Sequence, residues 1–116
     1  MIRIALAVLL LIAPAAAQEH EHHHPTEVIT GETALFYETW TMPDNPGLSC
    51  CSRRDCYATQ ARRQNGKVQA LHRESHEWID IPPEKVDERR DSPDGRSHLC
   101  ASESKVVICF VLGSGT

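Results

Sequence analysis

The chain has 116 residues and a formal net charge of −4 at pH 7, and 41% of its residues are hydrophobic. This length predicts one domain with a small core. The mildly acidic balance argues against a nucleic acid partner.

The first residues have the pattern of an export signal. A short basic start, MIR, precedes the apolar run IALAVLLLIA at 4–13, and Pro14 interrupts that run. The three alanines at 15–17 have the small-x-small form that a signal peptidase requires. The run is shorter than the roughly 20 apolar residues that a membrane-spanning helix needs. We therefore predict a signal peptide at 1–17, an exported protein that is periplasmic or secreted, and no membrane span in the mature chain.

Residues 18–30 are polar and rich in histidine, without apolar periodicity, so we expect a flexible tail. Cleavage after Ala17 makes Gln18 the first residue and puts a histidine in third place. A free amine, two deprotonated amides and an imidazole then form the square plane that Cu(II) and Ni(II) favour. The tract predicts capture of Cu, Ni or Zn by Gln18, His20, His22, His23 and His24. Two alternatives stay open: Gln18 can cyclise and lose its amine, and a hydrophilic tract also occurs as a plain solvated tail.

Residues 31–116 are expected to form the folded domain. A short helix is predicted over 31–40, with Phe36 and Trp40 on one face and Thr30 as a partial N-cap. Asp44-Asn45-Pro46-Gly47 is predicted to be a turn or loop.

The rest of the domain has strand and turn patterns. Asn65-Gly66 is the strongest hairpin signal, because both residues tolerate positive φ. The run at 106–111 is apolar throughout, which favours a central strand covered on both faces. The remaining expected elements are strands at 57–62, 67–72, 78–81 and 97–101, a helical turn at 83–89 and a turn at 91–95. The prediction is a small β-rich, disulfide-stabilised α+β domain: an antiparallel meander with one short N-terminal helix.

The cysteines all lie beyond the signal segment: Cys50, Cys51, Cys56, Cys100 and Cys109. In an exported protein the default interpretation is disulfides, and an odd number leaves one thiol over. The economical pairing joins the early cysteines to the late strands twice, closing loops of about 45–60 residues that contribute roughly 4 kcal/mol each. The thiol left over is then one of the early three. A local Cys51–Cys56 bridge is the alternative.

Other site chemistry is less well supported by the spacing. A metal site built from the cysteines and His98 lacks the paired knuckles of structural zinc. A thiol enzyme would need a base, and His72, His76 and His98 qualify by residue type only; ordinary surface or hydrogen-bonded roles suit them better. The segment at 91–95 lacks the ligand spacing of a calcium loop.

Four segments together have a distinctive pattern: FYETWTMPDNPGLSCCSRRDCY, PPEKV, RDSPDGRSHLC and CFVLGSGT. Over 36–116 the chain resembles a family of small, uncharacterised secreted proteins of Gram-negative bacteria. The resemblance implies that the CC-x4-C cluster and the S-P-D-G-R-x-H-x-C segment define the domain. It implies no activity, and the histidine tract lies outside it.

These patterns favour a small exported protein that is not an enzyme and that captures a divalent transition metal through its N-terminal histidine tract. One alternative is a structural or interaction module of the cell envelope, or a phage-associated accessory protein, acting on an unknown protein partner. A second alternative is a thiol enzyme that uses an unpaired cysteine.

Overall fold

The computed structural model describes residues 31–51 and 55–115. The described part contains one α-helix, one 3₁₀ turn and short strands, and the order of strands in each sheet is β1-β2, β3-β7-β8 and β4-β5-β6. The bounds are α1 (Glu32–Thr39), β1 (Thr41–Met42), β2 (Asn45–Ser49), β3 (Cys56–Thr59), β4 (Ala61–Gln64), β5 (Lys67–Leu71), β6 (Trp78–Asp80), η1 (Pro83–Lys85), β7 (Ser97–Ala101) and β8 (Val107–Val111).

The N-terminal helix α1 confirms the helix predicted over 31–40. Phe36 on its inner face and Trp40, which directly follows its last residue, have ring centroids 4.7 Å apart, and both are buried. Leu35 points outward and is 61% exposed. Gly31, with φ of 64°, precedes the first turn and supplies no side-chain cap. The predicted cap, Thr30, lies outside the described residues.

The central sheet has β7 in the middle and β3 and β8 on either side, all antiparallel. The run predicted at 106–111 is covered on both faces as expected, because Cys109 and Phe110 of β8 are buried in different clusters, but the prediction that it forms the central strand is wrong. β3, although distant in sequence, pairs with β7 on the side opposite β8. β8 is therefore an outer strand of this three-stranded sheet. The segment after η1 protects that edge, because Asp87 N–H donates to the carbonyl of Phe110 at 2.7 Å.

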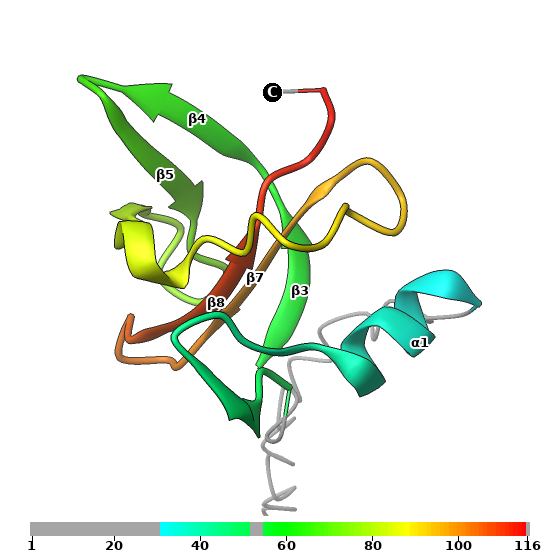
Figure 1. Ribbon diagram of the computed structural model, residues 1–116. Helices are drawn as coiled ribbons and strands as arrows, with labels where there is room; N and C mark the ends of the chain where they lie inside the picture. The colour runs from blue at the N-terminus through cyan, green and yellow to red at the C-terminus, as the bar shows by residue number, and fades with distance from the viewer. Residues whose placement is uncertain (1–30, 52–54, 116) are drawn as a thin grey trace, which may run out of the picture.

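The central sheet is covered on both faces (Figure 1). One face packs against α1, and its cluster comprises Phe36, Tyr37, Trp40, Cys50, Cys56, Cys100, Cys109 and Val111. The other face packs against the second sheet, and its cluster comprises Tyr57, Ala70, Ile81, Leu99, Ala101, Val107 and Phe110. Alternate residues of one strand reach opposite sides of a sheet, so Leu99 and Cys100 belong to different clusters.

The second sheet is a meander of β4, β5 and β6. Its first turn is the predicted Asn65-Gly66 hairpin, with φ of 53° and 76° at the two residues. The single strand predicted at 57–62 is divided at Gln60. The residues before Gln60 join the central sheet as β3 and those after it join the second sheet as β4. The chain therefore passes from one sheet to the other at Gln60, within a segment whose apolar and polar residues alternate only loosely.

The turn predicted at 44–47 is wrong. Asn45–Ser49 forms the exposed strand β2, which pairs with β1, and the turn falls at Pro43-Asp44. Pro46 fits this position because an edge strand tolerates a residue without an N–H. The hairpin ends at Cys50, whose N–H donates to the carbonyl of Trp40 at 2.9 Å.

The fold class is confirmed as a small β-rich α+β domain with antiparallel sheets, one short helix and cysteines at disulfide distance. No helix within 31–51 and 55–115 has the length and apolar character required to cross a membrane. At the end of the described chain Gly113 packs against the loop before β7. A Cβ there would lie 2.5 Å from the carbonyl oxygen of Gly95, so a side chain at this position has no room.

Candidate functional site

One disulfide joins the end of the first hairpin to the edge strand of the central sheet. Cys50 and Cys109 are bridged over 59 positions with their Cα atoms 5.8 Å apart, and they are 2% and 0% exposed. This is one of the long bridges that the sequence predicts.

The other three cysteines share one site. Cys56 lies at bonding distance from both Cys51 and Cys100, and its Cα atom is 5.7 Å and 4.0 Å from theirs. The sulfurs of Cys51 and Cys100 are 3.6 Å apart. Since a disulfide sulfur has one sulfur partner, Cys51–Cys56 and Cys56–Cys100 are alternative bridges. The sequence left these two pairings open, and the fold accommodates both at one place.

The strand register explains this gathering. Cys56 of β3 and Cys109 of β8 both stand opposite Cys100 of β7, so three sulfurs fall on one face of the sheet. Cys50 turns inward to Cys109. Cys51, the next residue, is half-buried at the edge of the cluster, and its N–H donates to the hydroxyl of Ser49 at 3.3 Å.

A buried hydrogen-bonded chain holds α1 against this face. The hydroxyl of Tyr37 lies 2.6 Å from Nδ1 of His98, and Nε2 of the same ring lies 2.7 Å from a carboxylate oxygen of Asp94. Because the carboxylate only accepts, Nε2–H donates to Asp94 and Nδ1 accepts from Tyr37. His98 is fully buried and occupies the same face of β7 as Cys100.

Asp94 is the charged end of this chain. Burial alone would raise its pKa. Hydrogen bonds from His98 and from the backbone N–H and guanidinium of Arg96 outweigh burial and hold the pKa well below its ordinary value of 3.8. The carboxylate also shapes the loop at 91–96, where it accepts from the hydroxyl of Ser92 at 3.2 Å. The S-P-D-G-R-x-H-x-C segment is therefore a unit that links a turn, a buried histidine and a cysteine.

Trp40 and Asp87 form a second polar anchor beneath α1. The indole N–H of Trp40 donates to the carboxylate of Asp87 at 3.0 Å, and both residues are buried. Burial raises the pKa of Asp87, but hydrogen bonds from Arg89 and from Trp40 outweigh it, so the pKa lies below the ordinary value of 3.8.

The other two histidines weighed as bases have structural positions. His72 is fully buried; its Nδ1 accepts from the N–H of Ser75 at 3.2 Å, which leaves Nε2–H to donate to the carbonyl of Ser102 at 2.9 Å. His76 is exposed in the turn that follows, with φ of 56°. These positions agree with the ordinary roles that the sequence favours for them.

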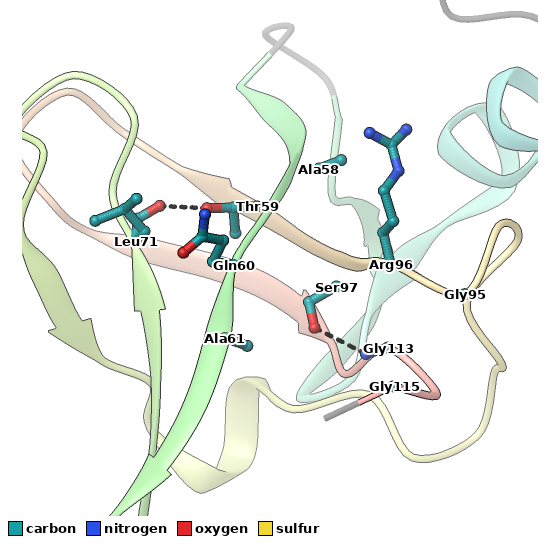
Figure 2. Close-up of a pocket in the computed structure, with 10 residues that line it drawn as sticks. All are labelled: Ala58, Thr59, Gln60, Ala61, Leu71, Gly95, Arg96, Ser97, Gly113 and Gly115. Atoms are coloured by element: carbon teal, nitrogen blue, oxygen red, sulfur yellow. Dashed lines mark hydrogen bonds between the residues drawn. The ribbon is translucent and has the colours of Figure 1, made fainter.

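An open cleft of about 660 Å³ lies between the β3–β4 junction and the chain's last described residues (Figure 2). Its wall is largely backbone and small side chains, and the hydroxyl of Ser97 accepts from the N–H of Gly113 at 2.8 Å within it. The charged side chain at its edge is Arg96, which pairs with Asp94 at 2.9 Å. Among the described residues that line the cleft, the one charged side chain is therefore already paired.

The predicted metal ligands and the observed cluster are different residues. Gln18, His20, His22, His23 and His24 lie outside the described residues. In contrast, Cys51, Cys56 and Cys100 each offer a ligand atom, and these atoms lie within 4.8 Å of one another. The spacing of the cysteines along the sequence argued against a cysteine metal site. That argument missed the cluster, because spacing carries no information about the register of β3 on β7. The H-x-C pattern at 98–100 was the available signal, because it puts both side chains on one face of a strand.

The chain matches no family model, no curated protein and no solved structure. Membership in a family of small secreted proteins therefore stays a prediction. What the geometry defines is a class: a small disulfide-stabilised α+β domain with a three-cysteine cluster on one face of its central sheet.

Proposed function

We propose that this chain is a small exported protein, not an enzyme, that attaches covalently to a disulfide-bearing partner through Cys51, whose thiolate attacks the partner's disulfide and releases one of its sulfurs as a thiol. The observation that carries the proposal is the position of Cys56 at bonding distance from two cysteines. One bridge among three sulfurs leaves one thiol. In an exported protein with bridged cysteines, an odd cysteine favours pairing with another molecule.

Access favours Cys51 as the point of attachment. Cys56 and Cys100 are 6% and 0% exposed, whereas Cys51 is half-buried. Cys51 lies two residues after the end of β2, and every residue of that strand is exposed. Thiol–disulfide exchange depends on access to the attacking sulfur, so a partner meets Cys51 first.

The odd number of sulfurs in the cluster favours stable attachment of a partner over a catalytic cycle that releases it. A thiol–disulfide enzyme releases its partner when a second thiol attacks the mixed disulfide. When Cys51 holds a partner, Cys56 and Cys100 bridge each other and supply no second thiol. The partner therefore stays attached until an external thiol removes it, which is the behaviour of an interaction module.

A matched pair of variants tests this assignment. Cys56→Ser with Cys100→Ser leaves Cys51 as the single thiol, and Cys51→Ser with Cys56→Ser leaves Cys100; both retain the Cys50–Cys109 bridge. With oxidised glutathione as the probe, we expect the first variant to gain one glutathionyl group at least about tenfold faster than the second. Intact mass spectra follow the adduct, and circular dichroism checks the fold. Equal rates, or no adduct on the first variant, would overturn the proposal.

Metal capture is the second candidate, and two features favour it. The histidine tract offers nitrogen ligands for Cu, Ni or Zn at Gln18, His20 and His22–His24. The reduced cysteine cluster offers three sulfurs within 4.8 Å, a ligand set that suits Cu(I) or Zn. Here the partner is a metal ion, and the disulfide-linked domain is its scaffold.

Native mass spectra of the exported protein, purified without a tag or chelator, separate these two metal sites. Deletion of residues 18–25 removes the tract, and Cys51→Ser removes one sulfur. A metal lost only on deletion supports the tract, and a metal lost only in Cys51→Ser after reduction supports the cluster. If added Cu, Ni and Zn all fail to bind the unaltered protein, metal capture is overturned.

A further inference from the structure

We infer that Cys56 transfers its bridge between Cys100 and Cys51, so that the cluster alternates between an accessible thiol at Cys51 and a sequestered thiol at Cys100. This inference rests on the proposed function and assigns separate roles to the three sulfurs. Cys51 is the attachment site, Cys100 stores the thiol, and Cys56 carries the bridge.

The contacts for such a transfer are present in the fold. Cys56 is at bonding distance from both neighbours, and the sulfurs of Cys51 and Cys100 are themselves 3.6 Å apart. A thiol left at either end is therefore already beside the disulfide that it would attack. Proximity of this kind makes exchange within the molecule favourable relative to exchange with a dilute partner.

The transfer conserves atoms and electrons. The thiolate of Cys51 attacks the sulfur of Cys56 in the Cys56–Cys100 bridge, so that the Cys51–Cys56 bond forms and the Cys56–Cys100 bond breaks. The electron pair of the broken bond leaves on Cys100, which then takes up a proton. The reverse step regenerates Cys51. No external oxidant or reductant takes part.

The two ends of the cluster differ in their surroundings. Cys100 is fully buried in the central strand and belongs to the same cluster as Phe36, Tyr37 and Trp40 of the helical segment. His98, two residues earlier on β7, connects that helix to Asp94 by hydrogen bonds. A thiol at Cys100 is therefore shielded from a partner, whereas a thiol at Cys51 is partly exposed.

The test maps the thiol in the full-length exported protein. Acid quenching stops exchange because it protonates the thiolate, and alkylation after denaturation then marks whichever cysteine is free. We expect two populations, one marked at Cys51 and one at Cys100. Prolonged alkylation of the native protein should instead convert the whole population to label at Cys51, since exchange keeps supplying that thiol. A single labelled position in the acid-quenched sample would overturn the inference.

Two single variants serve as controls. Cys51→Ser permits only the Cys56–Cys100 bridge, and Cys100→Ser permits only the Cys51–Cys56 bridge. Both should resist alkylation completely, and a free thiol in either would also overturn the inference.

The outcomes separate the inference from the proposed function. Label at Cys51 alone, together with glutathionylation of the Cys51-only variant, overturns the exchange and supports the attachment. Two populations without glutathionylation of that variant support the exchange and overturn the attachment.

Discussion

The two faces of the central sheet are held in different ways. On the face toward α1 the cluster contains four cysteines, and Tyr37, His98 and Asp94 connect the helix to the sheet. On the face toward the second sheet the cluster is mostly aliphatic, with Leu99 fully buried at its centre. The same three strands thus have a covalent and polar side and a side that depends on packing.

The difference follows from what covers each face. A single helix of eight residues buries only Phe36 and Tyr37 along its length, with Trp40 just beyond its end. This is little apolar area, so we expect the bridges and the buried hydrogen bonds to contribute substantially to the stability of this face. A three-stranded sheet covers the other face more fully, and hydrophobic burial is sufficient there. Function that needs reactive groups is therefore expected on the helical face.

The largest effect should come from removing the long bridge of the helical face. We expect the double variant Cys50→Ala with Cys109→Ala to lose about 4 kcal/mol of unfolding free energy, because the bridge closes a loop of 59 positions. Chemical denaturation measures the loss. The matched control is Cys51→Ala, which leaves Cys50–Cys109 and Cys56–Cys100 intact and should cost under about 1 kcal/mol. A double variant no less stable than the control contradicts the covalent character of this face.

The packed face should respond to loss of volume. Leu99→Ala removes a fully buried side chain, and we expect the unfolding free energy to fall by about 3 kcal/mol. Leu48→Ala, at a residue that is 52% exposed, should change it by less than about 0.5 kcal/mol. Denaturant midpoints compare the two. Similar midpoints would mean that packing does not hold this face.

The charged end of the polar chain should make stability depend on acid. Asp94→Asn should cost about 2 kcal/mol at neutral pH, because hydrogen bonds to a charged group are lost. The folded-state pKa of Asp94 lies below its ordinary value of 3.8. Its contribution is therefore complete well above that value and is lost as the pH falls through and below it. Unfolding measured between about pH 7 and 3 should give a flatter profile for Asp94→Asn than for the unaltered protein, and parallel profiles would contradict this role.

The smallest expected effect is the difference in unfolding free energy between two variants, each of which changes one tyrosine on one face of the sheet. Tyr37→Phe removes the partner of a fully buried His98 nitrogen, and we expect a loss of about 1 kcal/mol. Tyr57→Phe removes the hydroxyl that accepts from the N–H of Arg73. Because Arg73 is exposed, water can replace this acceptor, and we expect a loss of about 0.5 kcal/mol. Thermal unfolding of both variants measures the difference. The reverse order would mean that the polar chain does not hold α1.

The sequence predicts those elements whose signals are local. Asn65-Gly66 specifies its hairpin through positive φ, and the strand at 97–101 has the predicted bounds. The pairing of β3 with β7 is not local, because the two strands are separated by the whole second sheet. For this reason the sequence misplaces β8 as the central strand.

The sequence predicts which chemical groups the site contains, but it does not predict which cysteines lie together. Five cysteines after a predicted export signal indicate bridges and one thiol, and Cys50–Cys109 follows the expected long pairing. The gathering at Cys56 depends on Cys100 standing opposite it, which no linear spacing encodes. The chain from Asp94 to His98 had a local signal, since an aspartate after serine and proline favours a turn that its carboxylate can organise.

The Cys50–Cys109 bridge encloses β3 to β7 and the first part of β8, and this has a consequence for proteolysis. A single cut anywhere between these cysteines, for instance at the exposed hairpin tip Asn65-Gly66, leaves both fragments in one molecule. The nicked protein therefore migrates as a single species until a reductant separates its halves. For an exported protein, as we propose this one to be, release of the two fragments then waits for reduction of the bridge, and the lifetime of the nicked protein follows the supply of thiols around it.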